Sequence, residues 1–348
     1  MTLPRQHPST FPLTAIVPAF NEAPSVAETI RSVQEQTLPP CNIIVVDDCS
    51  TDETAAVAEA AGAWVARPPD NTGSKAGAQT FALPFVATEY VMALDADTTL
   101  ARDAIERMSK AFEDPEVAAA SGSVIPRQVS TMWERGRYVE YLFAFSFYKR
   151  IQDHYGKPLI SSGCFSLYRT DKLREIGGWS NRTLAEDMDL TWTLYQRGHK
   201  VRFLPDAVCY PIEPHNLDLM RKQLRRWSHG FVQNLRLHWR DVLGLGYLRS
   251  MVSLAFWDSI LASIGYLFAI PVLALLVNGA FAFAYVLDAP VILVPVLLSA
   301  HSRREVGRAL ASFPAYFPLR VANALMVLKA VFVELVLRRP LHVYEKGH

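Results

Sequence analysis

Two aspartates separated by one residue, Asp95 and Asp97, have the type and spacing to hold a metal ion. They follow Tyr90–Leu94, an apolar run that predicts a short buried strand. Ligands of open α/β sheets bind at the carboxyl ends of the strands, and two carboxylates there suit Mg²⁺ or Mn²⁺. Such a cation can neutralise a diphosphate. The alternative is a polar turn that caps a helix beginning near Ala101.

Two further polar sites have the same placement. Asp47 and Asp48 follow the apolar run 42–46, and Lys75 lies in a glycine-containing loop that leads into a helix. The start of a helix favours anions. Each feature is weak by itself, but three of them at the carboxyl ends of strands predict a phosphate-binding edge.

The elements that must position these residues alternate along the chain. Short apolar runs at 13–18, 42–46, 64–67 and 90–94 predict strands, and the segments 25–36 and 53–61 have helical spacing or composition. This alternation predicts an α/β fold with a mostly parallel, Rossmann-like sheet.

Composition narrows the class of protein. The 348 residues predict one large or two ordinary domains, and a net charge of +1 argues against a chain dedicated to nucleic acid. None of the four cysteines forms a C-x-x-C pair, which argues against a structural zinc site. Residues 1–12 are polar, without the apolar core of a signal peptide.

Three segments within the first 130 residues resemble the signatures of inverting family-two glycosyltransferases, which have a nucleotide-diphospho-sugar transferase fold. The segments are Pro18-Ala19-Phe20-Asn21-Glu22, Val46 to Asp52, and Leu94-Asp95-Ala96-Asp97. The resemblance implies that Asp48 contacts the base or ribose of the donor and that Lys75 lies near the nucleotide. It implies that Asp95 and Asp97 hold the metal and the diphosphate, and it adds further donor-binding residues, namely Pro18, Ala19, Asn21, Glu22 and Ala96.

The segment 160–169 resembles the part of the family that lines the acceptor site, which makes Ser162, Gly163 and Cys164 acceptor-binding candidates. Gly163 would let the backbone approach a sugar closely. Trp179, after two glycines, could offer its face to a sugar ring. The alternative for 160–169 is an ordinary strand edge of small residues.

An acidic pair, Glu186 and Asp187, begins a predicted helix. The resemblance places the general base at Asp187, with Glu186 beside it. The base must take a proton from the acceptor hydroxyl as that hydroxyl attacks the anomeric carbon opposite the leaving nucleotide, which inverts the centre. Leu184 departs mildly from the family, where a small or hydroxylated residue is usual. Acids also gather at helix starts for electrostatic reasons alone.

Gln223, Arg226 and Trp227 share one face of a predicted helix. Their basic surroundings alone would indicate a helix at a membrane surface. The Gln-x-x-Arg-Trp pattern after Glu-Asp resembles family members that build polysaccharides, such as cellulose and hyaluronan synthases. In these it holds the donor diphosphate and the acceptor end, which makes all three residues donor-binding candidates and Trp227 an acceptor-binding one as well.

The C-terminal part predicts a membrane region. Between residues 251 and 300 the charged residues are Asp258 and Asp288, which leaves room for two transmembrane helices near 253–276 and 279–298. Arginines flank both spans and predict that both outer ends face the cytoplasm, as in a multi-pass protein of the inner or plasma membrane: Arg249, Arg303, Arg304 and Arg308. Residues 310–337 predict an interfacial helix, or a third span. A soluble core is the alternative for the whole region. The aromatic segment 133–155 predicts a helix in the core or at a membrane surface rather than a stacking surface for nucleic acid.

We therefore expect a cytosolic glycosyltransferase domain over 1–240, with a donor half (1–130) and an acceptor and catalytic half (131–240), followed by a membrane region over 241–348. The predicted activity is metal-dependent, inverting transfer of a sugar from a nucleotide-diphosphate sugar to a saccharide, lipid or protein acceptor; the resemblance favours a UDP-sugar. Two or three membrane segments are few for a channel that conducts a polymer, and a homo-oligomer would supply more of them. The alternatives are a non-catalytic membrane assembly protein on a degenerate version of the fold, and a nucleotidyltransferase, for which a glycine-rich N-terminal phosphate loop is missing.

Overall fold

The structure is a computed structural model that describes residues 11–244 and 246–341. The chain divides into two compact units. The first extends to Ile125 and resumes over Gln152–Ile212, and the second comprises Pro126–Ile151 and the chain from Glu213. Residues 126–151, expected with the sheet, thus group with the C-terminal helices. Most of the polar N-terminal stretch, residues 1–10, lies outside the described residues.

The first unit is built on an eight-stranded sheet with the order β3-β2-β1-β4-β7-β6-β8-β5. Short apolar runs form its strands, and the inner ones are almost wholly buried because helices cover both faces. The strands are β1 (Leu13–Ala19), β2 (Asn42–Asp47), β3 (Trp64–Ala66), β4 (Tyr90–Leu94), β5 (Thr99–Leu100), β6 (Val117–Val124), β7 (Phe165–Arg169) and β8 (Lys200–Tyr210).

The sheet is mixed. β1 runs parallel to β2 and β4, β2 to β3, and β6 to β8. β7 runs antiparallel between β4 and β6, and the short β5 pairs antiparallel with β8. The predicted α/β class is confirmed, including the four strands of the first half. The reversal of β7 brings the segment before it to the edge where β1, β2 and β4 end.

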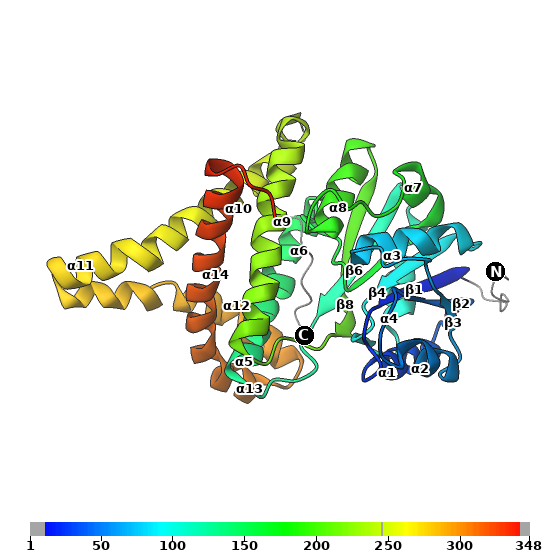
Figure 1. Ribbon diagram of the computed structural model, residues 1–348. Coiled ribbons are helices and arrows are strands. Elements are labelled where there is room, and N and C mark those ends of the chain that lie inside the picture. The colour runs from blue at the N-terminus through cyan, green and yellow to red at the C-terminus, as the bar shows by residue number, and fades with distance from the viewer. Residues whose placement is uncertain (1–10, 245, 342–348) are drawn as a thin grey trace. The chain divides into compact units, whose positions relative to one another are not determined.

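Helices lie on both sides of this sheet: α1, α2 and α4 appear below it in Figure 1, and α3, α7 and α8 above it. Their bounds are α1 (Val26–Gln34), α2 (Thr54–Ala60), α3 (Lys75–Ala82), α4 (Ala104–Ser109), α7 (Thr170–Glu175) and α8 (Glu186–Gln196), with 3₁₀ turns at Leu83–Phe85 and Lys110–Glu113. In α1 the helical spacing buries Val26, Ile30 and Val33 on one face.

The second unit is helical. It contains α5 (Met132–Phe143), η3 (Ala144–Tyr148), α9 (Leu217–Gly244), α10 (Gly246–Ile264), η4 (Gly265–Ala269), α11 (Ile270–Leu276), η5 (Gly279–Val286), α12 (Ala289–Ser302), α13 (Val306–Ser312), η6 (Phe313–Ala315), α14 (Tyr316–Val331) and η7 (Phe332–Val336); α6 (Lys149–His154) crosses the division. α14 lies beside α9, α10 and α5. Gly136 allows α5 to approach α14, because a Cβ there would lie 2.7 Å from the carbonyl oxygen of Ala315.

Two helical stretches of this unit are long and apolar enough to cross a membrane, Leu248–Leu276 and Gly279–Ser302. Most of their large apolar side chains are exposed, as in Leu254, Leu275 and Leu298. The chain turns between them at Asn278, whose side chain accepts a hydrogen bond of 2.8 Å from the amide of Ala280. In Figure 1 the two stretches run beside each other as the yellow and orange helices.

Candidate active site

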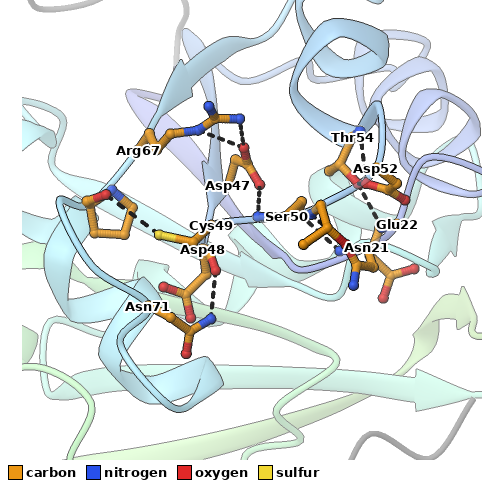
Figure 2. Close-up of polar contacts among 12 residues, drawn as sticks. Asn21, Glu22, Asp47, Asp48, Cys49, Ser50, Asp52, Thr54, Arg67 and Asn71 are labelled. Carbon is orange, nitrogen blue, oxygen red and sulfur yellow. Dashed lines mark hydrogen bonds and ion pairs between the residues drawn. The ribbon is translucent and has the colours of Figure 1, made fainter.

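The loops after β1 and β2 are joined by hydrogen bonds (Figure 2). Asn21 has a left-handed backbone conformation, donates its amide to Ser50 Oγ at 2.9 Å and accepts from the Thr51 amide at 2.8 Å. The amide of Glu22 donates to Thr54 Oγ1 at 2.7 Å. Asn21 and Glu22 therefore shape the edge where a donor would lie. Pro18 and Ala19 end β1 within the same edge, paired with β2.

The aspartates after β2 hold neighbouring loops. Asp47 forms an ion pair with Arg67, shown in Figure 2. The buried Asp48 accepts from the amide and the hydroxyl of Thr72, at 2.7 and 2.9 Å, and its carbonyl oxygen accepts from Asn71 Nδ2 at 2.6 Å. Asp48 thus fixes the loop that leads into α3. Its contact with a base or ribose remains a prediction.

Lys75 is the first residue of α3 and joins three segments. Ser74 caps this helix by accepting from the amide of Gly77 at 3.0 Å. The ammonium group of Lys75 forms an ion pair with Asp95, donates to the carbonyl oxygen of Gly163 at 2.8 Å, and lies 3.8 Å from Glu186 Oε1. A cation at a helix start beside two carboxylates can receive a phosphate.

Asp95 and Asp97 lie after β4, as expected. The side chain of Asp95 is partly exposed and paired with Lys75, whereas Asp97 is buried and accepts from Thr98 Oγ1 at 3.1 Å. Ala96, between them, accepts through its carbonyl oxygen from Thr29 Oγ1 at 2.8 Å. Both side chains offer carboxylate oxygens, which fit Mg²⁺ or Mn²⁺. Within residues 11–244 and 246–341 no three His, Cys, Asp or Glu side chains form a ready metal cluster.

The acceptor-site candidates lie next to Asp95 because β7 is antiparallel to β4. Leu94 pairs with Phe165, and the amide of Asp95 donates to the carbonyl oxygen of Cys164 at 3.2 Å. Gly163 is surrounded by charged groups, since a Cβ there would lie 3.1 Å from Lys75 Nζ and 3.3 Å from Asp187 Oδ2. Ser162 is buried in the same loop. Because Gly163 has no side chain, Lys75 and Asp187 can approach its backbone closely.

Asp187 is held by two backbone amides. Its Oδ2 accepts from Gly163 at 2.9 Å and its Oδ1 accepts from Met188 at 2.8 Å. It lies in the first turn of α8, which Glu186 begins, and the helix start stabilises both anions. Glu186 is buried and Asp187 is partly exposed. A fixed carboxylate with access to solvent is suited to take a proton from a bound hydroxyl.

Tyr168 is a neighbour of Asp187 that the sequence did not single out. It lies on β7 and is fully buried; burial raises the pKa of its hydroxyl to about 12, with the charge of Asp187 acting in the same direction. The ring of Trp179 packs edge-on against Tyr168, and Trp179 is 4% exposed. This placement is typical of a core residue. This arrangement does not support the predicted stacking of Trp179 on a sugar ring.

The Gln-x-x-Arg-Trp residues lie on α9 in the second unit. Gln223 is buried; its Oε1 accepts from Arg137 and its Nε2 donates to Glu213 at 3.2 Å. Trp227 is 37% exposed, and the guanidinium of Arg137 lies 4.5 Å from its ring centroid. Arg226 is one turn from Gln223 on the same helix. Their contact with a donor or an acceptor remains a prediction.

The first unit therefore brings together five predicted residues from four segments: Lys75, Asp95, Gly163, Glu186 and Asp187. Asp48 contributes indirectly, through the loop before α3.

Comparison with known proteins identifies similar sequences and a similar fold. The family described as Glycosyl transferase family 2 matches residues 14–177. The poly-beta-1,6-N-acetyl-D-glucosamine synthase of Staphylococcus aureus (strain COL) is 29% identical over 223 residues, which are 63% of this chain and 54% of that protein. The uncharacterized glycosyltransferase YaiP of Escherichia coli (strain K12) is 33% identical over 247 residues, 66% of this chain and 58% of that protein. This chain thus spans little more than half the length of these curated relatives.

Among solved structures, a mannosyltransferase of Pyrobaculum calidifontis, PcManGT, in complex with GDP-Man and Mn²⁺ superposes with a TM-score of 0.60. The alignment covers 96% of this chain and 91% of that one at 20% identity, so the likeness is one of fold. The family match begins at the second residue of β1 and extends past β7, so it contains the residues from Asn21 to Gly163, while Asp187 follows it. Residues 14–177 are therefore similar to glycosyltransferase family 2.

Proposed function

We propose that this protein is a membrane-anchored, inverting glycosyltransferase that uses a nucleotide-diphosphate sugar, with UDP-N-acetylglucosamine as the first donor to test. One observation carries the proposal: a chain of contacts runs from Asp187 through Gly163 to Lys75 and Asp95. It joins a candidate base to the groups suited to a diphosphate. The synthase relative from Staphylococcus aureus supports the choice of sugar, since its name specifies a polymer of N-acetylglucosamine.

In this mechanism, Asp187 accepts the proton of the acceptor hydroxyl while that oxygen forms its bond to the anomeric carbon. The bond from this carbon to the diphosphate oxygen breaks on the opposite side, which inverts the centre and leaves a nucleoside diphosphate. The amides of Gly163 and Met188 keep the carboxylate of Asp187 oriented. Lys75 offsets the negative charge that develops on the leaving diphosphate.

Asp95 and Asp97 are the residues that would hold Mg²⁺ or Mn²⁺, because both present hard oxygen ligands at the sheet edge. Such an ion supplies positive charge to the diphosphate when bound.

The membrane part of the proposal rests on the two apolar stretches Leu248–Leu276 and Gly279–Ser302. We propose that both cross the bilayer of the inner or plasma membrane. Arginines lie at the outer ends of both stretches, namely Arg249, Arg303, Arg304 and Arg308. They favour a cytoplasmic position for the sheet unit. Nucleotide sugars are made in the cytoplasm. α13 then lies at or near the membrane surface, whereas α14 packs against the two stretches, with Arg320 paired to Asp288 and placed over the ring of Tyr266.

The experiment is release of nucleoside diphosphate by the detergent-purified protein. A panel of UDP-, GDP- and dTDP-sugars is offered with Mn²⁺ or Mg²⁺, with and without cell lipid extract and β-1,6-linked N-acetylglucosamine oligosaccharides. Release from one donor that depends on metal supports the proposal. Binding without release indicates that the acceptor is missing from the reaction. Absence of both binding and release contradicts it and favours a non-catalytic assembly protein.

A further inference from the structure

We propose that Arg137 is a positioning residue for Trp227: it holds one face of the indole and ties Gln223 into the same cluster, so that the other face is presented to a sugar ring of the acceptor. This inference rests on the proposed function. It also gives Gln223 a structural role in place of the donor contact expected from the sequence.

The cluster is buried and polar. Arg137 lies on α5 with no exposed side-chain surface, forms an ion pair with Glu140, and lies 3.5 Å from Glu213 Oε2 through its Nε. Its Nη2 donates to Gln223 Oε1. Because Gln223 also donates to Glu213, both ends of its amide are used within the cluster.

Two aromatic rings enclose the guanidinium. Its central carbon lies 4.5 Å from the ring centroid of Trp227 and 5.5 Å from that of Tyr141. Tyr141 is fixed in turn, since its hydroxyl donates to Glu213 Oε1 at 2.8 Å. A planar guanidinium can stack on an aromatic face and hydrogen-bond at its edge at the same time, which a lysine cannot do.

A purely structural explanation accounts poorly for this arrangement. Replacing a buried ion pair by apolar residues of similar volume is often neutral or stabilising, so a buried arginine with two carboxylates is weak evidence of a stability role. Here the buried charge contacts a tryptophan that is 37% exposed, in contrast to the buried Trp192 and Trp179. The cluster thus fixes a partly open aromatic surface, which is a property of binding sites.

The occupied face determines which side of Trp227 can bind. With the guanidinium on one face, a sugar ring can stack only on the other, and the ring cannot turn without losing the contact to Arg137. Arg137 should therefore affect the use of the acceptor more than the use of the donor.

Arg137→Gln and Arg137→Lys test this inference. The matched control is Arg169→Lys, because Arg169 also lies over two rings, Tyr90 and Phe112, but belongs to the sheet unit. Donor hydrolysis of UDP-N-acetylglucosamine without acceptor is compared with transfer to a β-1,6-linked N-acetylglucosamine trisaccharide. In parallel, ¹⁹F NMR of protein labelled with 5-fluorotryptophan follows Trp227, whose resonance is assigned with Trp227→Phe.

We expect Arg137→Gln to raise the KM for the acceptor at least tenfold, to leave donor hydrolysis within twofold of wild type, and to shift or broaden the Trp227 resonance. Arg137→Lys should give a smaller rise, and Arg169→Lys should change neither the KM nor the resonance. An unchanged acceptor KM with an unmoved resonance overturns the inference, as does an equal loss of hydrolysis and transfer. If wild type neither binds nor turns over any donor, the proposed function fails, whereas an unmoved resonance overturns the positioning role separately.

Discussion

The backbone amide of Gly163 donates a hydrogen bond of 2.9 Å to Oδ2 of Asp187. The carbonyl oxygen of the same glycine accepts from Lys75 Nζ at 2.8 Å. One peptide segment thus contacts both the candidate base and the candidate phosphate ligand. The distance between the two functional groups is set by backbone geometry rather than by flexible side chains.

Asp187→Asn should lower kcat by roughly 10²- to 10⁴-fold, because an amide cannot take the proton of the acceptor hydroxyl. The amide oxygen can still accept from Gly163, so donor affinity should stay within about twofold of wild type. Single-turnover transfer and calorimetric titration with the donor measure the two effects. Asp171→Asn, an exposed carboxylate on α7, is the control and should change neither. Full activity of the Asp187 variant would remove this residue from the mechanism.

Gly163→Ala should reduce transfer while the protein remains folded. The added methyl group would lie 3.1 Å from Lys75 Nζ and 3.3 Å from Asp187 Oδ2, so both groups must move by a few tenths of an ångström. Small displacements of reacting groups are costly in catalysis, and we expect a loss of about tenfold or more. Gly307→Ala in α13 is the matched control, because nothing lies within 4 Å of a Cβ there. Equal activity of the two variants would contradict the tight packing around Gly163.

Arg320→Ala should destabilise the second unit in detergent. Arg320 on α14 pairs with Asp288, between η5 and α12, and lies over the ring of Tyr266 at 4.3 Å. Asp288 lies inside the second apolar stretch, where an unpaired charge costs on the order of 2 kcal/mol. The double variant Arg320→Ala, Asp288→Ala should recover part of the lost thermal stability. A double variant less stable than Arg320→Ala alone would show that the pair is not what matters.

The start of α5 should respond to acid. Thr131 and Glu134 form a capping box, and the Thr131→Ala variant should cost about 1 kcal/mol of stability. Burial opposes ionisation of Glu134, but hydrogen bonds from the Thr131 amide and from Ser130 outweigh it, so its pKa lies below the ordinary value of 4.5. The stability it contributes is therefore present above this pH and lost as the pH falls.

Thermal unfolding at pH 7 and pH 4 checks this sign. The Tm of wild type should exceed that of Glu134→Gln by less at pH 4 than at pH 7. The exposed control Glu113→Gln should have the Tm of wild type at both pH values. A difference in Tm that grows towards pH 4 would show that the pKa of Glu134 is not lowered by folding.

The first half of the fold could be predicted because apolar runs and polar strand ends coincide. Tyr90–Leu94 has the bounds that its composition predicted, and Asp95 follows it directly. β6 was missed because its β-branched residues, Val117 and Val124, lie only at its ends, around an interior of alanine, serine and glycine. The reversal of β7 could not be predicted, since alternation of side chains carries no information on strand direction.

Long-range contacts account for the remaining differences. Arg137 and Gln223 lie far apart in the sequence, and each is ordinary in its own helix, so their hydrogen bond becomes visible only when α5 and α9 both pack against α14. The same contacts explain why residues 126–151 group with the C-terminal helices. Trp179 follows two glycines of positive φ, a pattern that does not tell a binding residue from a core residue.

The antiparallel β7 also determines where the chain can be lengthened. Because Phe165 is paired with Leu94, one residue inserted between Cys164 and Phe165 would shift the loop of Gly163 past Asp95 by a full strand step. Gly62 and Gly198 precede β3 and β8, at the amino ends of these strands and away from the candidate site. Both glycines lie in turns at the surface. A peptide tag or fluorescent reporter inserted at either glycine should therefore leave the transfer reaction intact, which makes these two turns the places to mark the protein in living cells.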